Sequence, residues 1–333
     1  VIDIIPDEFI VDGFDGIKDP RGMMGVRMEM HAVMYTGPKT ILHNIKKCIQ
    51  KAGLKVKATV VAPLATARLA MSDAEQDFGS ILIDMGGGQT TAAVIHDHKL
   101  KYTYVDQEGG DYVTRDISVV LNTSIENAES LKRTYGFAMA NQASSEDVFP
   151  VQVVGKQEPE QVSEEYLAEI IEARMRQVFE KINRVNAFQL PGGIILTGGM
   201  AALPEIRELA EEIFGVSVKI YIPQEMNLRF PSFSQVIGLV NYVTKMSDIE
   251  RLVKGSLEGN TIDITADTIP YADSMISNNF DTTAVSNDYV DDYVETADVE
   301  PQDLQETQPK HKQNKKKNGI LSKAKNFMES FFD

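Results

Sequence analysis

Apolar residues follow two spacings along residues 1–250, and segments of the two kinds alternate. Short runs rich in β-branched residues predict strands at 9–11, 26–30, 56–62, 80–84, 90–96, 100–105, 151–154, 194–196 and 216–221. Apolar residues at helical spacing predict helices at 38–52, 64–71, 110–121, 124–135, 163–186, 204–214 and 232–245. This alternation of strands and helices is typical of an α/β fold.

The periodic pattern ends near residue 255, where Ser, Thr, Asn and Asp become dominant. Such a composition cannot bury enough apolar surface to offset the entropy of ordering, so we predict a disordered acidic linker over 249–314. The last segment, 315–333, regains helical spacing and predicts an amphipathic helix. Its apolar stripe consists of Ile320, Leu321, Ala324, Phe327, Met328, Phe331 and Phe332, and Lys323 lies on another face.

A short apolar helix with lysines nearby suits an anionic membrane surface. The alternative is a terminal helix that folds back onto the body, although a helix meant for the core rarely needs so long a linker. The formal net charge of −16 supports the membrane interpretation, because it divides into −8 over 1–256, −13 over 257–309 and +5 over 310–333. The acidic linker is expected to stay away from anionic lipid, and the basic end to contact it.

Composition argues against several classes of protein. A hydrophobic content of 43% is enough for a sizeable core and roughly two domains. Cys48 is the one cysteine, which favours the reducing cytoplasm over a disulfide framework. No apolar run approaches the roughly 20 residues that span a bilayer, and the acidic body argues against nucleic-acid binding. The sequence opens inside a predicted strand, 1–5, so we expect an N-terminal portion to precede it.

The most informative motif is the turn Asp84-Met-Gly-Gly-Gly-Gln-Thr90. A strand brings the carboxylate of Asp84 to its end, and Gly86, Gly87 and Gly88 permit positive φ and close approach of backbone N–H groups to an anion. Gln89 and Thr90 add side-chain donors. A phosphate chain fits such a turn, and Asp84 is a candidate to organise Mg²⁺ through water. The alternative is an ordinary hairpin with a glycine-rich tip.

Two further segments carry weaker signals of the same kind. Thr197, Gly198 and Gly199 follow an apolar strand and precede a helix, as a nucleotide-contacting turn does, although a tight strand–helix connection has the same pattern. Glu129 and Lys132 are three residues apart, so they share one helix face. They are candidates to bind a ribose or an adenine edge, and the alternative is an ion pair on a solvated face.

Taken together and in this order, these segments resemble those of the superfamily of actin, heat-shock chaperone and sugar-kinase ATPases. Within it, the sequence is similar to the FtsA family of bacterial cell-division proteins. The shared motifs are Asp84-x-Gly-Gly-Gly-x-Thr90, Gly109-Gly110, Ala128-Glu-Ser-Leu-Lys132, Ile195-x-Thr-Gly-Gly199 and Gly238, with Ile17-x-Asp-Pro-x-Gly-Met23, Arg27-x-Glu29, Thr114-Arg-Asp-Ile117, Tyr135-Gly136 and Ile171-Glu-x-Arg174 in support. The resemblance covers nearly all of residues 1–245 and the C-terminal end.

The resemblance implies a two-lobed, actin-like (ribonuclease H-like) fold that binds ATP and Mg²⁺. Residues 1–37 are expected to be the remainder of a family-specific small subdomain, 38–78 the remainder of the first actin-like domain, and 79–248 the second domain. The turn at 84–90 corresponds to the second phosphate loop, whereas the first phosphate loop is not found in this sequence. Residues 62–70 offer no Gln, Glu or Asp to position water, so at most weak hydrolysis is expected, with ATP acting as a conformational and polymerisation ligand.

The resemblance also implies partners. An inserted subdomain at about 110–190 is expected to receive the C-terminal tail peptide of the tubulin-like protein FtsZ, with Arg174 as the best candidate contact because it lies among basic residues in an acidic body. The alternative is pairing of Arg174 with Glu169, Glu172 or Glu180 of the same helix. Self-association into filaments and contacts with other division proteins are implied as well.

The expected function is therefore that of a tether between the FtsZ ring and the cytoplasmic face of the membrane at the division site. Two alternatives remain open at this point. One is a sugar or carboxylate kinase of the same superfamily, which needs a catalytic acid facing the nucleotide. The other is an actin-like assembly protein for a surface appendage, which would not bind FtsZ.

Overall fold

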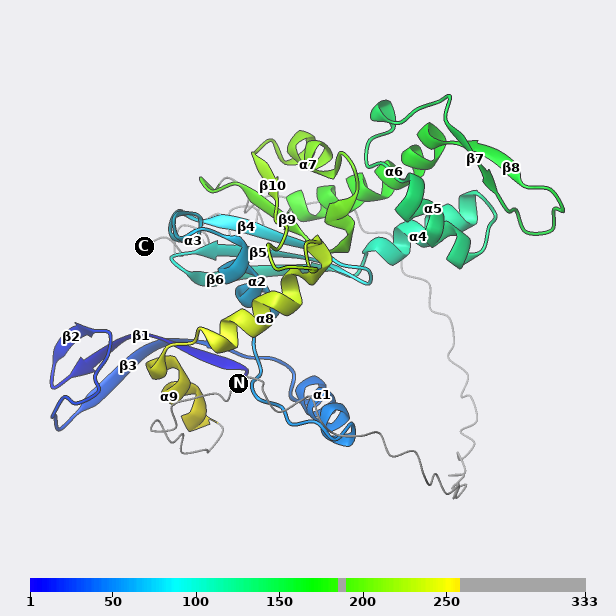
Figure 1. The fold of residues 1–333 in the computed structure, drawn as a ribbon. Helices are drawn as coiled ribbons and strands as arrows, with labels where there is room; N and C mark the ends of the chain where they lie inside the picture. The colour runs from blue at the N-terminus through cyan, green and yellow to red at the C-terminus, as the bar shows by residue number, and fades with distance from the viewer. Residues whose placement is uncertain (185–189, 258–333) are drawn as a thin grey trace, which may run out of the picture. The chain divides into compact units, whose positions relative to one another are not determined.

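The computed structural model describes residues 1–184 and 190–257 (Figure 1). The strands are β1 (Asp3–Val11), β2 (Phe14–Ile17), β3 (Met28–Tyr35), β4 (Ser80–Met85), β5 (Thr90–His96), β6 (Lys99–Asp106), β7 (Val148–Val151), β8 (Glu160–Ser163), β9 (Ile194–Thr197) and β10 (Val218–Ile220). The α-helices are α1 (Lys39–Lys51), α2 (Ala62–Ala70), α3 (Asp73–Phe78), α4 (Gly110–Val120), α5 (Ile125–Tyr135), α6 (Glu164–Asn183), α7 (Ile206–Phe214), α8 (Ser234–Thr244) and α9 (Asp248–Leu257). Short 3₁₀ helices are η1 (Ala140–Gln142), η2 (Gly199–Ala202) and η3 (Pro231–Phe233).

A five-stranded mixed sheet lies at the centre of the body, in the order β10-β9-β4-β5-β6. β4, β5 and β6, all predicted as strands, pair as an antiparallel meander. β9 runs parallel to β4, and the register pairs Ile83 with Leu196 and Asp84 with Thr197. The two motif-bearing strands therefore end side by side, at the carboxyl edge where ligands bind in open α/β sheets.

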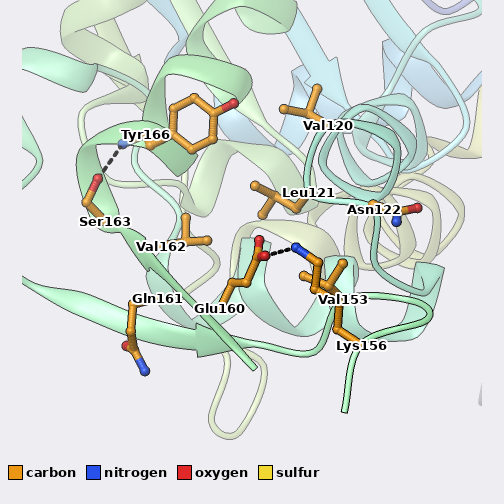
Figure 2. Close-up of a pocket in the computed structure, with 10 residues that line it drawn as sticks. All are labelled: Val120, Leu121, Asn122, Val153, Lys156, Glu160, Gln161, Val162, Ser163 and Tyr166. Atoms are coloured by element: carbon orange, nitrogen blue, oxygen red, sulfur yellow. Dashed lines mark hydrogen bonds and ion pairs between the residues drawn. The ribbon is translucent and has the colours of Figure 1, made fainter. Parts of the chain in front are cut away.

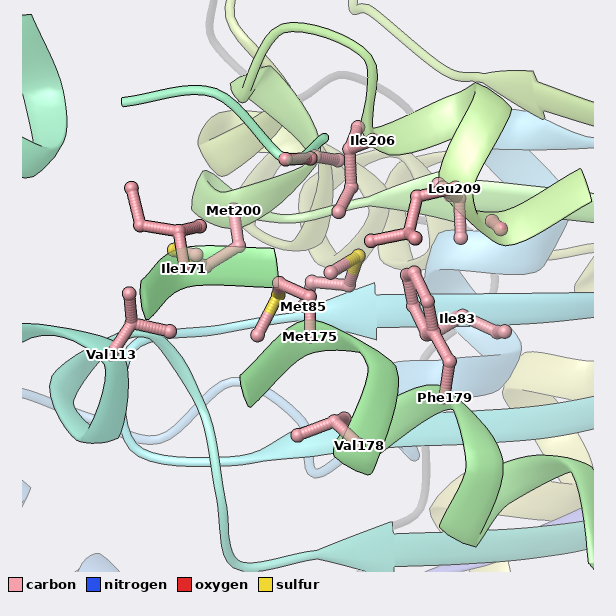
Figure 3. Packing of buried hydrophobic residues seen from close by; sticks show 14 of the residues in the cluster. Ile83, Met85, Val113, Ile171, Met175, Val178, Phe179, Met200, Ile206 and Leu209 are labelled. Atoms are coloured by element: carbon pink, nitrogen blue, oxygen red, sulfur yellow. The ribbon is translucent and has the colours of Figure 1, made fainter. Parts of the chain in front are cut away.

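Helices cover both faces of this sheet, as Figure 1 shows with α6 and α7 on one side and α2 and α8 on the other. Ile81, Ile83 and Met85 of β4 belong to the core cluster that contains the buried residues of α6 and α7 (Figure 3). Leu82 packs with Ala67 of α2 on the opposite face. Since side chains alternate along a strand, Asp84 lies on the face of Leu82 and of α2.

A separate three-stranded antiparallel sheet, β2-β1-β3, is built from the N-terminal residues. It contacts the rest of the chain mainly where its strand β1 packs against helix α9. Asp3 of β1 forms an ion pair with Lys254 of α9 at 3.0 Å and accepts a hydrogen bond from the hydroxyl of Tyr242 at 3.3 Å. Residues 249–257 had been predicted as part of the acidic linker, and α9 corrects that boundary: Leu252 and Val253 are half-buried and Lys254 is buried.

Two further predictions of secondary structure were wrong, and one helix was missed. The segment 56–62 forms no strand, because among the described residues no strand lies beside it, and α2 already begins at Ala62. The strand predicted at 151–154 is β7, which ends at Val151 and pairs with the unpredicted β8. Helix α3 was missed although Ser72 and Glu75 form a capping box, a signal that the sequence carries.

Other element boundaries were confirmed. Ser124 and Ser163 accept hydrogen bonds from backbone N–H groups in the first turns of α5 and α6, as N-cap residues do. Helix α1 ends just before Gly53. The amphipathic helix predicted at 315–333 and the linker beyond residue 257 lie outside the described residues.

Candidate functional site

The carboxylate of Asp84 lies at the end of β4, between the first glycine turn and the second. A Cβ added to Gly198 would lie 2.6 Å from Oδ1 of Asp84 and 2.5 Å from the carbonyl oxygen of Met85. The side-chain amide of Gln235, at the start of α8, donates to Oδ2 of Asp84 at 3.4 Å. Burial raises the pKa of Asp84 above its ordinary value. Asp84 is thus a half-buried carboxylate that has no cationic partner among the described residues, and a bound cation would stabilise it.

The first glycine turn is closed by a hydrogen bond from Gly86 N–H to the carbonyl of Gln89 at 3.0 Å. The expectation of positive φ was wrong, since Gly86, Gly87 and Gly88 all lie outside that region. Close packing instead requires glycine at the facing position 109, where a Cβ would lie 2.4 Å from the Gly87 carbonyl oxygen. Gly87 and Gly88 are exposed, and within the part of the chain that the structure describes their N–H groups donate no hydrogen bond. They are the groups that an anion would meet.

Two predicted ligand donors have structural partners instead. The hydroxyl of Thr90 is buried and donates to the carbonyl oxygen of Glu108 at 2.9 Å. The hydroxyl of Thr197 is buried as well and donates to the carbonyl of Pro231 at 3.2 Å. Both threonines therefore position their turns. Gln89 is exposed, and its amide contacts Thr91 at 3.3 Å.

The second turn passes close to the first. Gly198 has φ of 90°, a conformation that favours glycine. Its N–H donates to the Pro231 carbonyl at 3.3 Å. Gly199 begins η2, and a Cβ there would meet nothing nearer than Ser232 at 4.0 Å, so open space faces this residue.

Glu129 and Lys132 form a largely internal network rather than a solvated pair. Lys132 is only 6% exposed, and its ammonium contacts Glu129 at 2.6 Å, Thr114 at 2.8 Å and the Gly110 carbonyl at 2.9 Å. Burial alone would raise the pKa of Glu129, but hydrogen bonds from Lys132, Thr114 and Arg133 lower it to about 2. Both residues are thus fixed at the N-terminal end of α4.

The three predicted segments converge on one backbone position. Gly110 donates its N–H to the Gly86 carbonyl at 2.9 Å and accepts from Lys132. A Cβ on Gly110 would lie 2.8 Å from the sulfur of Met200, which follows the second turn. The first turn, the second turn and the Glu129–Lys132 pair therefore surround the start of α4.

A metal ion at this site would have few protein ligands. No group of three or more His, Cys, Asp or Glu side chains suited to a metal occurs among the described residues. Asp84 is the carboxylate at the end of β4, and one carboxylate with bound waters and phosphate oxygens is a donor set that Mg²⁺ accepts. The residues present fit a water-mediated ion brought with a phosphate ligand.

Arg174 is fully engaged within the chain. Its guanidinium binds Asp116 of α4 in a bidentate fashion, at 2.6 and 2.9 Å, and Glu108 at 3.0 Å. Within the described residues, its carboxylate partners therefore lie on α4 and in the segment before it, and are not the glutamates of its own helix that the sequence also suggested. Two neighbouring arginines of the predicted basic cluster are paired too: Arg176 with Glu172 and Glu212, and Arg184 with Glu180.

A pocket that the sequence did not indicate lies beside the first turn of α6 (Figure 2). Its volume is about 490 Å³. The lining comes from the end of α4, the β7–β8 hairpin and α6, with Val120, Leu121 and Tyr166 as its apolar part. The ion pair between Lys156 and Glu160 crosses one side, as Figure 2 shows. All the lining residues fall within the predicted inserted subdomain.

The candidate membrane-binding residues, Ile320, Leu321, Lys323, Ala324, Phe327, Met328, Phe331 and Phe332, lie outside the described residues. Within residues 1–184 and 190–257, no helix has both the length and the apolar character needed to cross a bilayer.

The central mixed sheet, covered by helices on both faces and ending in two adjacent glycine turns, defines an actin-like α/β protein, as predicted. The structure is similar to MreB5 of Spiroplasma citri bound to ADP, with a TM-score of 0.53, 16% identity, and coverage of 67% of this chain and 69% of that chain. The same protein bound to AMPPNP gives a TM-score of 0.52 at 16% identity over 67% and 68% of the two chains. At such identities the similarity is one of fold.

The family is shown by sequence. The model for "Cell division protein FtsA" matches residues 81–238, and the model for "SHS2 domain inserted in FTSA" matches residues 1–36. The chain is 47% identical to cell division protein FtsA of Enterococcus hirae, over 100% of this chain and 72% of that protein. It is 54% identical to cell division protein FtsA of Enterococcus faecalis, over 78% of this chain and 60% of that protein. The chain belongs to the FtsA family of cell division proteins.

Proposed function

We propose that the chain is an ATP-binding, self-associating division protein that tethers the FtsZ ring to the cytoplasmic face of the membrane at the division site. The observation that carries the nucleotide part is the convergence of two glycine turns and the Asp84 carboxylate at the carboxyl edge of β4 and β9. Membership of the FtsA family supports the role in division.

ATP binds with its phosphates against the exposed N–H groups of Gly87 and Gly88. Mg²⁺ reaches Asp84 through water, and relief of the buried carboxylate contributes to binding. Glu129 and Lys132 lie beside the ribose or base. The nucleotide acts as a conformational and polymerisation ligand with weak hydrolysis or none, because α2 carries no Gln, Glu or Asp. The ADP and AMPPNP bound to MreB5 support this assignment by fold alone.

Gly88→Val tests the phosphate site. A Cβ at Gly88 meets nothing within 4 Å, so valine fits the fold but occupies the space that an anion would fill. In the protein expressed from its complete gene, calorimetric titration with Mg-ATP should show affinity reduced by about tenfold or more. Ser145→Val, in another exposed loop, is the matched control and should bind like the wild type. Unreduced affinity of Gly88→Val would exclude this loop as the phosphate site.

The C-terminal helix attaches the chain to anionic lipid by inserting Phe327 and the rest of its apolar stripe, with Lys323 and the upstream lysines near the headgroups. Phe327→Glu should release the protein from vesicles containing phosphatidylglycerol. Asn326→Glu adds the same charge on another face and serves as the control. Equal sedimentation of both variants with the vesicles would exclude the stripe as the anchor.

The C-terminal tail peptide of FtsZ binds the subdomain formed by α4, α5, α6 and the β7–β8 hairpin. Its acidic groups compete for Arg174, whose side chain is still 18% exposed, and its apolar residues occupy the pocket beside Tyr166. Arg174→Glu should abolish peptide binding, but it also sets a third carboxylate against Asp116 and Glu108. Tyr166→Asp, at an exposed position with no ion pair among the described residues, is therefore the second variant. Unchanged peptide affinity in both would refute the assignment.

A further inference from the structure

The segment from Asp106 to Asp111 connects two regions that the proposed function keeps apart, the phosphate turn and helix α6. Its backbone is bound to the phosphate turn. Gly110 N–H donates to the Gly86 carbonyl at 2.9 Å, and Asp111 N–H donates to the Gly87 carbonyl at 2.8 Å. Movement of the turn by a ligand therefore displaces this segment as well.

The side chain of Glu108 joins the same segment to α6. One carboxylate oxygen accepts from Lys181 at 2.5 Å and the other from Arg174 at 3.0 Å. The carbonyl of Glu108 accepts the hydroxyl of Thr90, at the end of the turn. The three charged side chains are partly shielded from solvent, with exposed fractions of 18% for Arg174, 19% for Glu108 and 28% for Lys181, so these hydrogen bonds are stronger than those of a fully exposed ion pair.

Helix α6 extends from the residues that bind Glu108 to the pocket. Its 20 residues begin beside the pocket, where Tyr166 forms part of the lining, and Arg174 and Lys181 follow further along the same helix. The helix is packed along its length by buried residues of the main core (Figure 3). A packed helix moves as a unit, so a displacement at Lys181 is transmitted to Tyr166.

We propose that Glu108 is a positioning residue that couples the nucleotide site to the peptide-binding subdomain. A ligand in the phosphate turn shifts residues 106–111. The hydrogen bonds of Glu108 to Arg174 and Lys181 then displace α6 and the residues that line the pocket. By linkage, the peptide changes nucleotide affinity by the same factor as the nucleotide changes peptide affinity. This inference rests on the proposed function, because it needs both ligands.

The test is a linkage measurement on the protein from its complete gene. The affinity of the FtsZ tail peptide is measured with and without saturating Mg-ATP in the wild type, Glu108→Gln and Lys181→Gln. The wild-type ratio should be about fivefold or more, and it should approach one in both variants. Arg176→Gln is the matched control, since Arg176 lies on the same helix but pairs with Glu172 and Glu212, and its ratio should equal the wild type's.

The outcomes separate the inference from the function on which it rests. If both ligands bind and the ratio is one in the wild type, or unchanged in Glu108→Gln and Lys181→Gln, the coupling is wrong and the proposed function stands. If either ligand fails to bind the wild type, the proposed function fails and the coupling with it. A second test uses hydrogen exchange of the wild-type protein alone. Mg-ATP should slow exchange along α6 as well as at residues 86–90, and protection confined to 86–90 would overturn the coupling.

Discussion

Replacing Lys254 with methionine tests how the N-terminal sheet is attached to the rest of the chain. Lys254 is 7% exposed and Asp3 is 2% exposed, so the pair that they form is shielded from water. The ammonium of Lys254 also donates to the Thr59 carbonyl at 2.6 Å. Methionine is similar in length, so the variant removes the charge and the hydrogen bonds and leaves the packing of α9 nearly unchanged.

The loss of stability expected for Lys254→Met follows from the partners that Asp3 keeps in that variant. Its carboxylate retains hydrogen bonds from the Ile4 N–H at 3.1 Å and the Tyr242 hydroxyl at 3.3 Å, but within the described residues it keeps no ion-pair partner. Removing one partner of a buried ion pair costs about 3–5 kcal/mol. Arg251→Met, on the same helix, breaks a pair with Asp248 in which both side chains are about half exposed, and it should cost about 1 kcal/mol or less.

Urea unfolding followed by far-UV circular dichroism measures both variants, because the chain contains no tryptophan for fluorescence. Asp3→Asn combined with Lys254→Met leaves no uncompensated charge, so the double variant should recover at least half of the loss. A Lys254→Met protein within about 1 kcal/mol of the wild type would refute the buried pair as the attachment. A double variant as unstable as the single one would show that lost packing, rather than the uncompensated charge, causes the effect.

Three further predictions concern the site and its supports. Asp84→Asn should abolish Mg-ATP binding in calorimetry yet raise thermal stability at neutral pH by roughly 0.5–2 kcal/mol, because it removes a charge whose burial raises its pKa. Glu129 has a pKa of about 2 in the folded protein, below its ordinary 4.5, so its contribution to the free energy of unfolding is present above pH 4.5 and lost as pH falls toward 2. Glu129→Gln should therefore flatten the dependence of stability on pH in that range. An unchanged slope would contradict the network around Glu129. Ser163→Ala should cost about 1 kcal/mol in urea unfolding through loss of the α6 N-cap, whereas no loss would contradict the cap.

Much of the body could be predicted from sequence because its signals are local. The strands β4, β5 and β6 are short runs rich in β-forming residues, and α6 begins at a serine cap. The positions of the two glycine turns followed from strands that end in Asp84 and Thr197. Their adjacency did not follow from the local pattern, since it depends on β9 pairing in parallel with β4, a long-range choice that the family resemblance supplied.

The parts that were missed depend on distant partners. The period of 56–62 suits a strand, yet a strand needs a neighbour, and within the described residues none is beside it. Helix α9 is polar in composition, and its place is fixed by Asp3, far away along the chain. For Arg174 the sequence suggested either a peptide or glutamates of its own helix, but Asp116 and Glu108 bind it from another helix and from the segment before that helix. The hydroxyls of Thr90 and Thr197 have carbonyl partners that no sequence spacing reveals.

Tethering of FtsZ is most directly tested by co-sedimentation of three components. Fluorescent FtsZ is mixed with phosphatidylglycerol vesicles and Mg-ATP, with and without the protein from its complete gene. FtsZ should sediment with the vesicles when the wild-type protein is present and stay in the supernatant with Phe327→Glu or Tyr166→Asp. FtsZ that remains in the supernatant with the wild-type protein, or that sediments equally with both variants, would contradict the tethering function.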